Sequence, residues 1–282
     1  MNYSYHASIK SNRSDELVNV YLQRPAAGII TMLLFYLPVT PNFVTLLSTL
    51  AGIAASLLLF FPSPDLILSA LLFYAKDIFD SADGQLARAK QLYSRRGRFY
   101  DSIGDFVVHL FLFVGIYFQL RYAGYSYGSA ALVSVIGFLG VNLRVSYQVY
   151  YQTAFLHEQK KYLNNRLSEE LQPEDFHEDR ITLLLQKIFL GMYGWQDAVI
   201  KRIDTALTKN ISSESELHSW NQNSAALFLN RLYGLGTEFV LLTLSLLFLT
   251  IEWYLIISIF FMNLLWIISL LYRIFLSKRI EQ

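Results

Sequence analysis

The stretch FVTLLSTLAGIAASLLLFF, residues 43–61, decides the fold because its nineteen residues carry no charge. A helix needs about 20 mostly apolar residues to cross the roughly 30 Å hydrocarbon core of a bilayer. Helices buried in a soluble all-helical protein would carry charge on one face, and this stretch has none. Similar runs occupy residues 106–120 (reaching back to 99 if two aspartates are tolerated), 128–151, 232–250 and 254–272. We therefore predict an all-α, polytopic membrane protein.

A sixth span is predicted between the first two runs, although its sequence is interrupted. Residues 66–75 are apolar, but the chain continues as KDIFDSAD over residues 76–83. This helix can cross the membrane only if its second half faces protein or water. Upstream, residues 15–37 are helix-like but broken at Arg24-Pro25, and the apolar part, residues 26–37, is too short to span. It is predicted to be an N-terminal interfacial helix lying on the membrane.

The composition excludes several classes of protein. Hydrophobic residues make up 54% of the 282 residues and charged residues 16%, with a formal net charge of +1. A nucleic-acid partner is not expected, because binding phosphates requires a basic surplus. The absence of cysteine excludes disulfides and thiolate chemistry. The polar first ten residues predict no cleavable signal peptide.

The positions of lysine and arginine predict the orientation, because these residues accumulate in cytoplasmic loops. Three precede residue 43, five lie between spans two and three, eight lie in residues 152–225 and three follow residue 272. Both termini and the junction of spans two and three are therefore predicted to be cytoplasmic. The predicted regions are a cytoplasmic N-terminus and interfacial helix (1–42), spans one to four (43–156), a cytoplasmic insertion (157–223), and spans five and six with a tail (224–282).

The insertion, between spans four and five, is predicted to be helical and to rest partly on the membrane surface. Residues 181–190 form an amphipathic run, with Trp195 close behind. His157-Glu158 and the run 177–179 (His-Glu-Asp) invite a metal interpretation, but they lack helical ligand spacing. A solvated polar face is the favoured explanation for both.

Four aspartates flank the junction of spans two and three. Span two ends D80SADGQLAR88 and span three begins G97RFYDSIGD105. On helices, positions 80, 83, 84, 87 and 88 share one face, as do 97, 101 and 105. Both sets lie near one bilayer depth, where four carboxylates are tolerable together only if some protonate or a cation joins them. All-oxygen ligands favour Mg²⁺ or Mn²⁺ over Zn²⁺, and Arg88 is suited to phosphate.

This constellation resembles the signature of the class I CDP-alcohol phosphotransferase (CDP-alcohol phosphatidyltransferase) family, D-x2-D-G-x2-A-R-x8-G-x3-D-x3-D. Every fixed position is filled, by Asp80, Asp83, Gly84, Ala87, Arg88, Gly97, Asp101 and Asp105. The resemblance implies a membrane-embedded transferase of phospholipid biosynthesis. Such an enzyme moves a substituted phosphate group from a CDP-linked donor to an alcohol hydroxyl and releases CMP.

The resemblance also implies roles for single residues. Two divalent ions, Mg²⁺ or Mn²⁺, would be held by Asp80, Asp83 and Asp101 and by Asp80, Asp101 and Asp105. Asp105 would also be the general base. Gly84 and Arg88 would contact the cytidine diphosphate, with Ser94 beside them and Asn42 and Thr45 as further donor-site candidates; helix capping or packing explains the last three equally well. Family members are commonly homodimers, so the resemblance also predicts a homodimer for this chain.

Several alternatives stay open. The donor is either CDP-diacylglycerol, with a small polar acceptor, or a CDP-linked small alcohol that reacts with diacylglycerol, as in the ethanolamine and choline type. The sequence after Asp101 lacks the D-P-x-A-D-K continuation of the glycerophosphate branch. An ion-coupled transporter is disfavoured because its charges would lie near the bilayer midplane, and a non-catalytic scaffold would lack CMP release. Arg144 either pairs with Glu238 or, with Arg98, lines an acceptor pocket; His109 either tunes the site or is packed.

Overall fold

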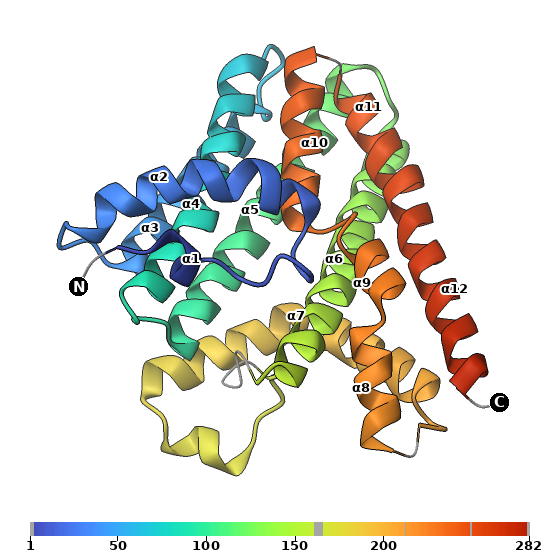
Figure 1. The fold of residues 1–282 in the computed structure, drawn as a ribbon. Coiled ribbons are helices and arrows are strands. Elements are labelled where there is room, and N and C mark those ends of the chain that lie inside the picture. Colours follow the sequence, from blue (N-terminus) through green and yellow to red (C-terminus); the bar gives the residue numbers. More distant parts are fainter. Residues whose placement is uncertain (1–2, 161–165, 212, 249, 281–282) are drawn as a thin grey trace.

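Every regular element in the described part of the chain is a helix (Figure 1). The structure, a computed structural model, describes residues 3–160, 166–211, 213–248 and 250–280. The all-α prediction is therefore confirmed for these residues. The predicted insertion, residues 157–223, includes residues 161–165 and 212, which lie outside them.

The first half of the chain supplies the helices that carry the aspartates. In chain order the elements are α1 (Tyr5–Ser8), the π-helical η1 (Asn19–Gln23), α2 (Arg24–Phe35), α3 (Pro41–Leu58), α4 (Leu66–Ala89), α5 (Arg95–Tyr122) and α6 (Tyr127–Glu158). The second half comprises the 3-10 turn η2 (Pro173–His177), α7 (Arg180–Leu207), α8 (Glu214–Gln222), α9 (Ser224–Asn230), α10 (Leu235–Phe248), α11 (Ile251–Ile256), the π-helical η3 (Ile257–Met262) and α12 (Asn263–Ile280).

Five helical segments of the described chain are long and apolar enough to cross a membrane. They are α3, α5, α6, the segment Ser224–Phe248 and the segment Ile251–Arg279. These are the five runs predicted to be clear spans, and they support a multi-pass integral membrane protein. The interrupted span is also one continuous helix, α4, with 24 residues. At about 1.5 Å per residue its length suits a crossing, but its second half carries the charges noted above.

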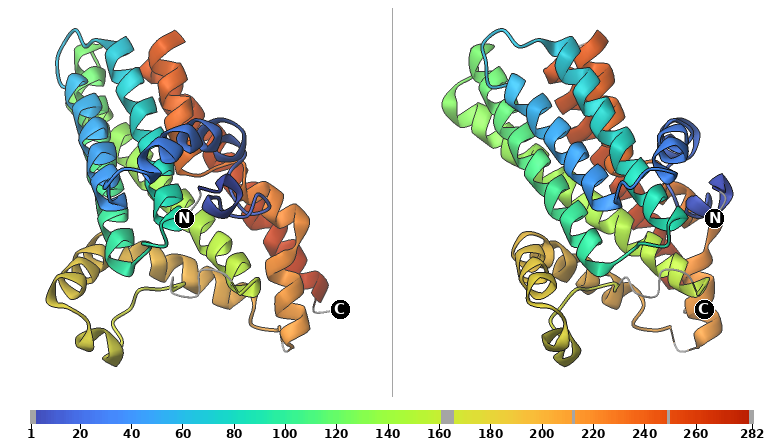
Figure 2. Two further views of the ribbon diagram at one scale, coloured as in Figure 1. Left: turned by 60° about the vertical axis from the view of Figure 1, so that its left-hand side comes forward. Right: turned by 90° about the vertical axis from the view of Figure 1, so that its left-hand side faces the viewer.

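The N-terminal helix differs from the prediction at Arg24-Pro25. The backbone stays helical through Gln23 and Arg24, and η1 runs directly into α2. The predicted break is instead a change from π-helical to α-helical geometry. Pro25, which has no N–H to donate, lies at this change of geometry in the first turn of α2. Figure 2 shows α2 nearly end-on beside the long bundle helices, so it runs across the bundle.

Small residues bring the aspartate-bearing helices together. A Cβ atom on Gly104 of α5 would lie 2.3 Å from Thr49 Oγ1 of α3, and one on Gly52 would lie 2.7 Å from the Val108 side chain. Small residues at such crossings let helix backbones approach closely in a membrane. Close packing of α3 against both α4 and α5 sets the faces of α4 and α5 that carry the signature opposite each other.

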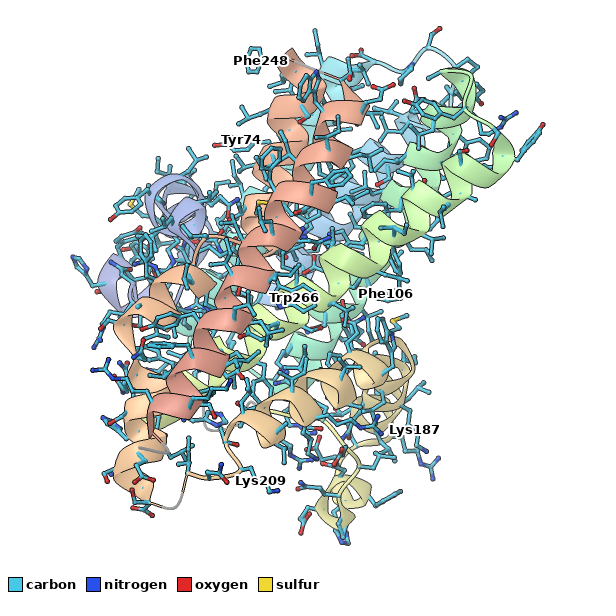
Figure 3. The ribbon with its side chains drawn as sticks, turned by 90° about the vertical axis from the view of Figure 1, so that its right-hand side faces the viewer. Tyr74, Phe106, Lys187, Lys209, Phe248 and Trp266 are labelled. Carbon is cyan, nitrogen blue, oxygen red and sulfur yellow. The ribbon has the colours of Figure 1, made fainter. Side chains whose placement is uncertain are left out.

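Helix α7 lies across one end of the bundle (Figures 1 and 3). Its Phe189 ring contacts Phe99 of α5 at 5.5 Å, and Tyr193 Oη donates a hydrogen bond of 2.8 Å to Ser102 O. The side of α7 away from these contacts exposes a stripe of large apolar residues at helical spacing. The stripe comprises Ile181, Leu184, Ile188, Trp195 and Val199.

Candidate active site

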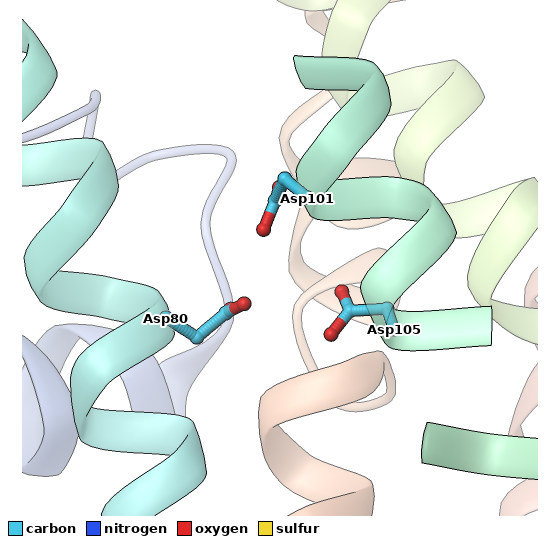
Figure 4. Close-up of side chains that lie close together, drawn as sticks. All are labelled: Asp80, Asp101 and Asp105. Atoms are coloured by element: carbon cyan, nitrogen blue, oxygen red, sulfur yellow. The ribbon is translucent and has the colours of Figure 1, made fainter. Parts of the chain in front are cut away.

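Three of the four predicted metal ligands converge between α4 and α5. Asp80 projects from α4 toward Asp101 and Asp105, which lie one turn apart on α5 (Figure 4). One carboxylate oxygen of each lies within 4.8 Å of the others. Among the described residues, this is the only group of three or more side chains placed to hold a metal ion.

The fourth aspartate, Asp83, lies beside this group rather than in it. Its carboxylate is buried and accepts a hydrogen bond of 2.6 Å from Thr45 Oγ1 of α3. Thr45, predicted as a candidate donor contact, therefore holds Asp83 in place. Asp80 and Asp83 share a face of α4, so the Asp83 carboxylate lies next to the candidate metal group without being part of it.

The aspartates fit a hard divalent cation. Asp101 Oδ1 is buried and has no hydrogen-bond partner in the part of the chain that the structure describes, which is costly for a carboxylate oxygen unless a cation or donor meets it. The cluster offers only oxygen ligands, as Mg²⁺ and Mn²⁺ prefer. The group is thus compatible with a divalent metal.

The sequence prediction missed a lysine in the same cluster. Lys76 of α4 is buried, and its Nζ lies 2.5 Å from Asp105 Oδ1 and 3.4 Å from Asp80 Oδ1. Lys76 begins the charged half of the interrupted span, one helical turn before Asp80. The four-residue spacing on one helix could have predicted the contact between Lys76 and Asp80. Nothing in the local sequence indicated the contact between Lys76 and Asp105.

A cavity of about 470 Å³ adjoins the aspartates and is lined by signature residues of α4 and α5. Asp83 and Asp101 line it, and all five residues predicted to bind substrate line it as well. These five are Asn42, Thr45, Gly84, Arg88 and Ser94.

Two glycines shape this first cavity. A Cβ on Gly97 would lie 3.1 Å from Asn42 Oδ1 and 3.3 Å from Ser94 Oγ, and a Cβ on Gly84 would lie 3.3 Å from Arg88 Nη1. Ser94 is also the N-cap of α5, accepting a hydrogen bond of 3.1 Å from Gly97 N. The capping interpretation of Ser94 is thus confirmed, and its side chain still lines the cavity.

A second cavity, of about 300 Å³, lies on the other side of Asp101. Asp101 and Asp105 line it, whereas Asp105 does not line the first cavity. Helices α6 and α7 contribute polar side chains such as Asn142 and Tyr193, and six carboxylates and three basic residues make the lining highly charged. Lys10, Arg98, Asp101 and Arg166 line both cavities, whereas Asp105 faces only the second.

The insertion is tied to the start of α5 by ion pairs. Arg95 contacts Glu169, Asp175 and Glu178 at 2.5–2.8 Å, and Arg98 also pairs with Glu169. Burial would raise the pKa of Asp175, but hydrogen bonds, first among them those from Arg166, hold that pKa well below its usual value. The acids of residues 169–178 thus build the outer wall of the site, which the sequence prediction did not foresee.

The remaining polar candidates contact other helices of the bundle. Arg144 and Glu238 form a fully buried ion pair of 2.6 Å, which confirms the first of the two alternatives. His109 is buried, stacks on the Phe239 ring at 5.3 Å and also lines the second cavity. Glu158 interacts with His218 at 3.0 Å rather than forming a metal-binding group with His157.

Comparison with known proteins agrees with this geometry. The sequence model of the CDP-alcohol phosphatidyltransferase family matches residues 38–208, which include all four aspartates and both edges of the first cavity. The chain belongs to this family. Membership confirms the resemblance seen in the signature.

A relative from Archaeoglobus fulgidus, described as a bifunctional IPC transferase and DIPP synthase, is 38% identical over 109 residues. The match covers 39% of this chain and 20% of the relative, so the chain spans about a fifth of that protein's length.

Proposed function

We propose that the chain is a membrane-embedded, divalent-metal-dependent transferase of phospholipid biosynthesis. It moves a substituted phosphate group from a CDP-linked donor to an alcohol hydroxyl and releases CMP. The observation that carries this proposal is the pair of cavities that share Asp101. The first is lined by every predicted donor contact, and the second by Asp105.

The first cavity suits the nucleotide end of the donor. Arg88 presents a planar guanidinium that matches phosphate oxygens, and its Nε is oriented by a hydrogen bond of 2.5 Å to Ser8 O. The bare backbone at Gly84 and Gly97 leaves room for a diphosphate next to the aspartates. Asn42 supplies an amide at the same wall.

The metal ligands are assigned from the signature and from the cluster. Asp80, Asp83 and Asp101 would hold one divalent ion, and Asp80, Asp101 and Asp105 the second. Bound Mg²⁺ or Mn²⁺ would neutralise the negative charge that develops on CMP as it leaves the diphosphate of the donor. Thr45 contributes indirectly by fixing the Asp83 carboxylate.

Asp105 is the proposed general base. It takes the proton of the acceptor hydroxyl as that oxygen attacks the phosphorus, while the bond from the phosphorus to the CMP oxygen breaks. A base must lie within hydrogen-bond reach of the hydroxyl, so the acceptor belongs in the second cavity, which Asp105 lines. The donor phosphorus then lies between the two cavities, beside Asp101.

The lining of the second cavity favours a small polar acceptor over diacylglycerol. Diacylglycerol would have to bring its acyl chains close to charged residues of both signs, such as Arg98, Arg166 and Asp197, where apolar groups gain little. A small alcohol with several hydroxyl groups would find hydrogen-bond partners among these side chains. This supports CDP-diacylglycerol, rather than a CDP-linked small alcohol, as the donor.

The proposed topology has six spans, with α4 as the sixth. An even number of spans places both termini on one side, and the lysine and arginine distribution makes that side cytoplasmic. The aspartates, the insertion and both cavities then face the cytoplasm. The apolar stripe of α7 and exposed residues of α2, such as Ile29, Leu33 and Tyr36, support contact of these helices with the membrane surface. Homodimer formation stays a prediction from the resemblance.

The test is CMP release from CDP-diacylglycerol by the purified chain, with Mg²⁺ or Mn²⁺ and a panel of small polar alcohols. EDTA should abolish release. Asp105→Asn should abolish turnover while leaving metal-dependent donor binding largely intact. Asp65→Asn is the matched control, because Asp65 caps α4 and asparagine caps equally well. An active Asp105→Asn enzyme would refute the base assignment, and metal-independent release would refute the metal-dependent mechanism.

A further inference from the structure

Lys76 occupies the metal-ligand cluster as a buried cation. Its ammonium contacts Asp105 and Asp80, two of the three aspartates that form the candidate metal group. The Lys76 side chain is only 1% exposed, against 27% for Asp80 and 15% for Asp105, so its charge is met by these carboxylates rather than by water. In the metal-free protein, Lys76 and the carboxylates of Asp80 and Asp105 therefore neutralise each other's charge.

The position of Lys76 is fixed by three helices. Its Nζ lies 4.5 Å from the centre of the Phe239 ring of α10, a cation–π contact. Its aliphatic stem packs against α3, where Cγ lies 3.0 Å from the Cβ position of Gly52. Ser48 Oγ of α3 donates a hydrogen bond of 2.9 Å to the Lys76 carbonyl. Contacts on all these sides keep the ammonium at the deep edge of the cluster.

We propose that Lys76 is an internal counter-ion that competes with the divalent ion nearest Asp105. An ammonium and a divalent cation that share the same carboxylates repel each other across a poorly solvated space. The two metal positions are therefore unequal: the one nearer Asp83 fills first, and the one at Asp105 fills only against the charge of Lys76. The proposal rests on the proposed function only in taking these aspartates as ligands.

Two effects of opposite sign follow from removing the charge. Metal binding becomes tighter, because the carboxylates lose a competitor. The metal-free protein becomes less stable, because buried carboxylates lose a counter-ion. A lysine with a merely structural role would act differently, since its loss would disorder the ligands and weaken metal binding.

The experiment measures Mn²⁺ binding to the full chain in detergent micelles, by electron paramagnetic resonance of free Mn²⁺ and by calorimetry. Lys76→Met keeps an unbranched stem without the charge, and we expect its weaker Mn²⁺ site to bind at least about ten-fold more tightly than in the wild type. Its unfolding temperature in EDTA should fall, and its stabilisation by Mn²⁺ should grow. Lys76→Arg, which keeps the charge, should resemble the wild type. Lys90→Met is the matched control, because Lys90 donates hydrogen bonds to the backbone carbonyls of Leu37 and Val39 and forms no ion pair among the described residues.

Unchanged or weaker Mn²⁺ binding by Lys76→Met would overturn the proposal, as would a wild type that binds no Mn²⁺. If Lys76→Met does not fold in EDTA, it is purified in Mn²⁺ together with Lys76→Gln, and the ion retained against increasing EDTA is measured. Longer retention than in the wild type supports the proposal, and equal or shorter retention overturns it. Because these readouts need no turnover, an enzyme that binds Mn²⁺ as expected but releases no CMP would contradict only the proposed function.

Discussion

Two groups of charges inside the helical bundle are built in opposite ways. In the first, Arg144 of α6 pairs with Glu238 of α10, one charge against one. Neighbours add hydrogen bonds: Glu238 accepts from Tyr254 and Ser258, and Arg144 donates to Asn263, although Arg144 Nε has no partner among the described residues. This group is balanced in charge and linked to several helices.

The second group, between α4 and α5, carries an excess of negative charge. The signature contributes four aspartates against one lysine, which contacts Asp80 and Asp105, and Asp101 Oδ1 has no partner among the described residues. A buried pair of balanced charge stabilises an arrangement of helices, whereas an unbalanced set leaves charge to be met by a ligand. The contrast separates a structural ion pair from a site, although both look alike in sequence as isolated charges in apolar spans.

The largest effect is expected from Asp101→Asn. Turnover should fall at least about 1,000-fold, equivalent to about 4 kcal/mol, because a ligand shared by both proposed ions is lost. The unfolding temperature in EDTA should nevertheless rise, because one of several mutually repelling charges is gone. CMP release and thermal unfolding measure the two effects, with Asp179→Asn at the N-cap of α7 as the control. A less stable Asp101→Asn protein in EDTA would place Asp101 in the same structural class as Glu238.

The balanced group should respond in the opposite way. Arg144→Met leaves Glu238 buried without its partner, which we expect to lower the free energy of unfolding by about 3–5 kcal/mol. The double variant Arg144→Met/Glu238→Met should regain most of this loss, because no unpaired charge remains. Unfolding in mixed micelles measures both changes, and CMP release per folded molecule should stay near that of the wild type. A double variant as unstable as the single one would show that the loss of stability does not come from leaving Glu238 without its partner.

Much of the fold and of the site was predictable because it depends on short-range patterns. A charge-free run long enough to span a bilayer identifies a membrane helix without knowledge of its neighbours. The helical period alone places Asp101 and Asp105 on one face, and the short loop between α4 and α5 makes Asp80 face them. The first cavity was predictable from the same faces of α4 and α5, because Gly84 and Gly97 place no side chains on them.

The missed features depend on contacts between distant parts of the chain. Lys76 was visible in the sequence, but its contact with Asp105 depends on how α4 and α5 cross. The same holds for Arg95, whose acidic partners lie more than 70 residues away in the insertion. For Arg144 the sequence left two interpretations open, and only the packing of α6 against α10 selects the ion pair with Glu238.

The smallest expected effect concerns Asp197 of α7, a single carboxylate at the second cavity. Burial raises its pKa to about 6, the charges of Glu169 and Glu170 add to this, and Arg98 opposes it. Because the pKa is higher in the folded than in the unfolded chain, where it is about 4, the ionised form destabilises the fold. This penalty is absent below about pH 4 and complete above about pH 6.

Asp197→Asn should therefore increase the free energy of unfolding at pH 7.5 by about 1–3 kcal/mol. Below about pH 4 the advantage should disappear, because the wild-type carboxyl is then protonated in both states. Unfolding temperatures of the two proteins across pH 4–8 measure the effect, with Asp65→Asn as the control. An equal difference at both ends of this range would mean that Asp197 acts through its hydrogen bonding. It would then resemble the balanced group rather than the site, whose carboxylates are kept under mutual repulsion because a ligand relieves it.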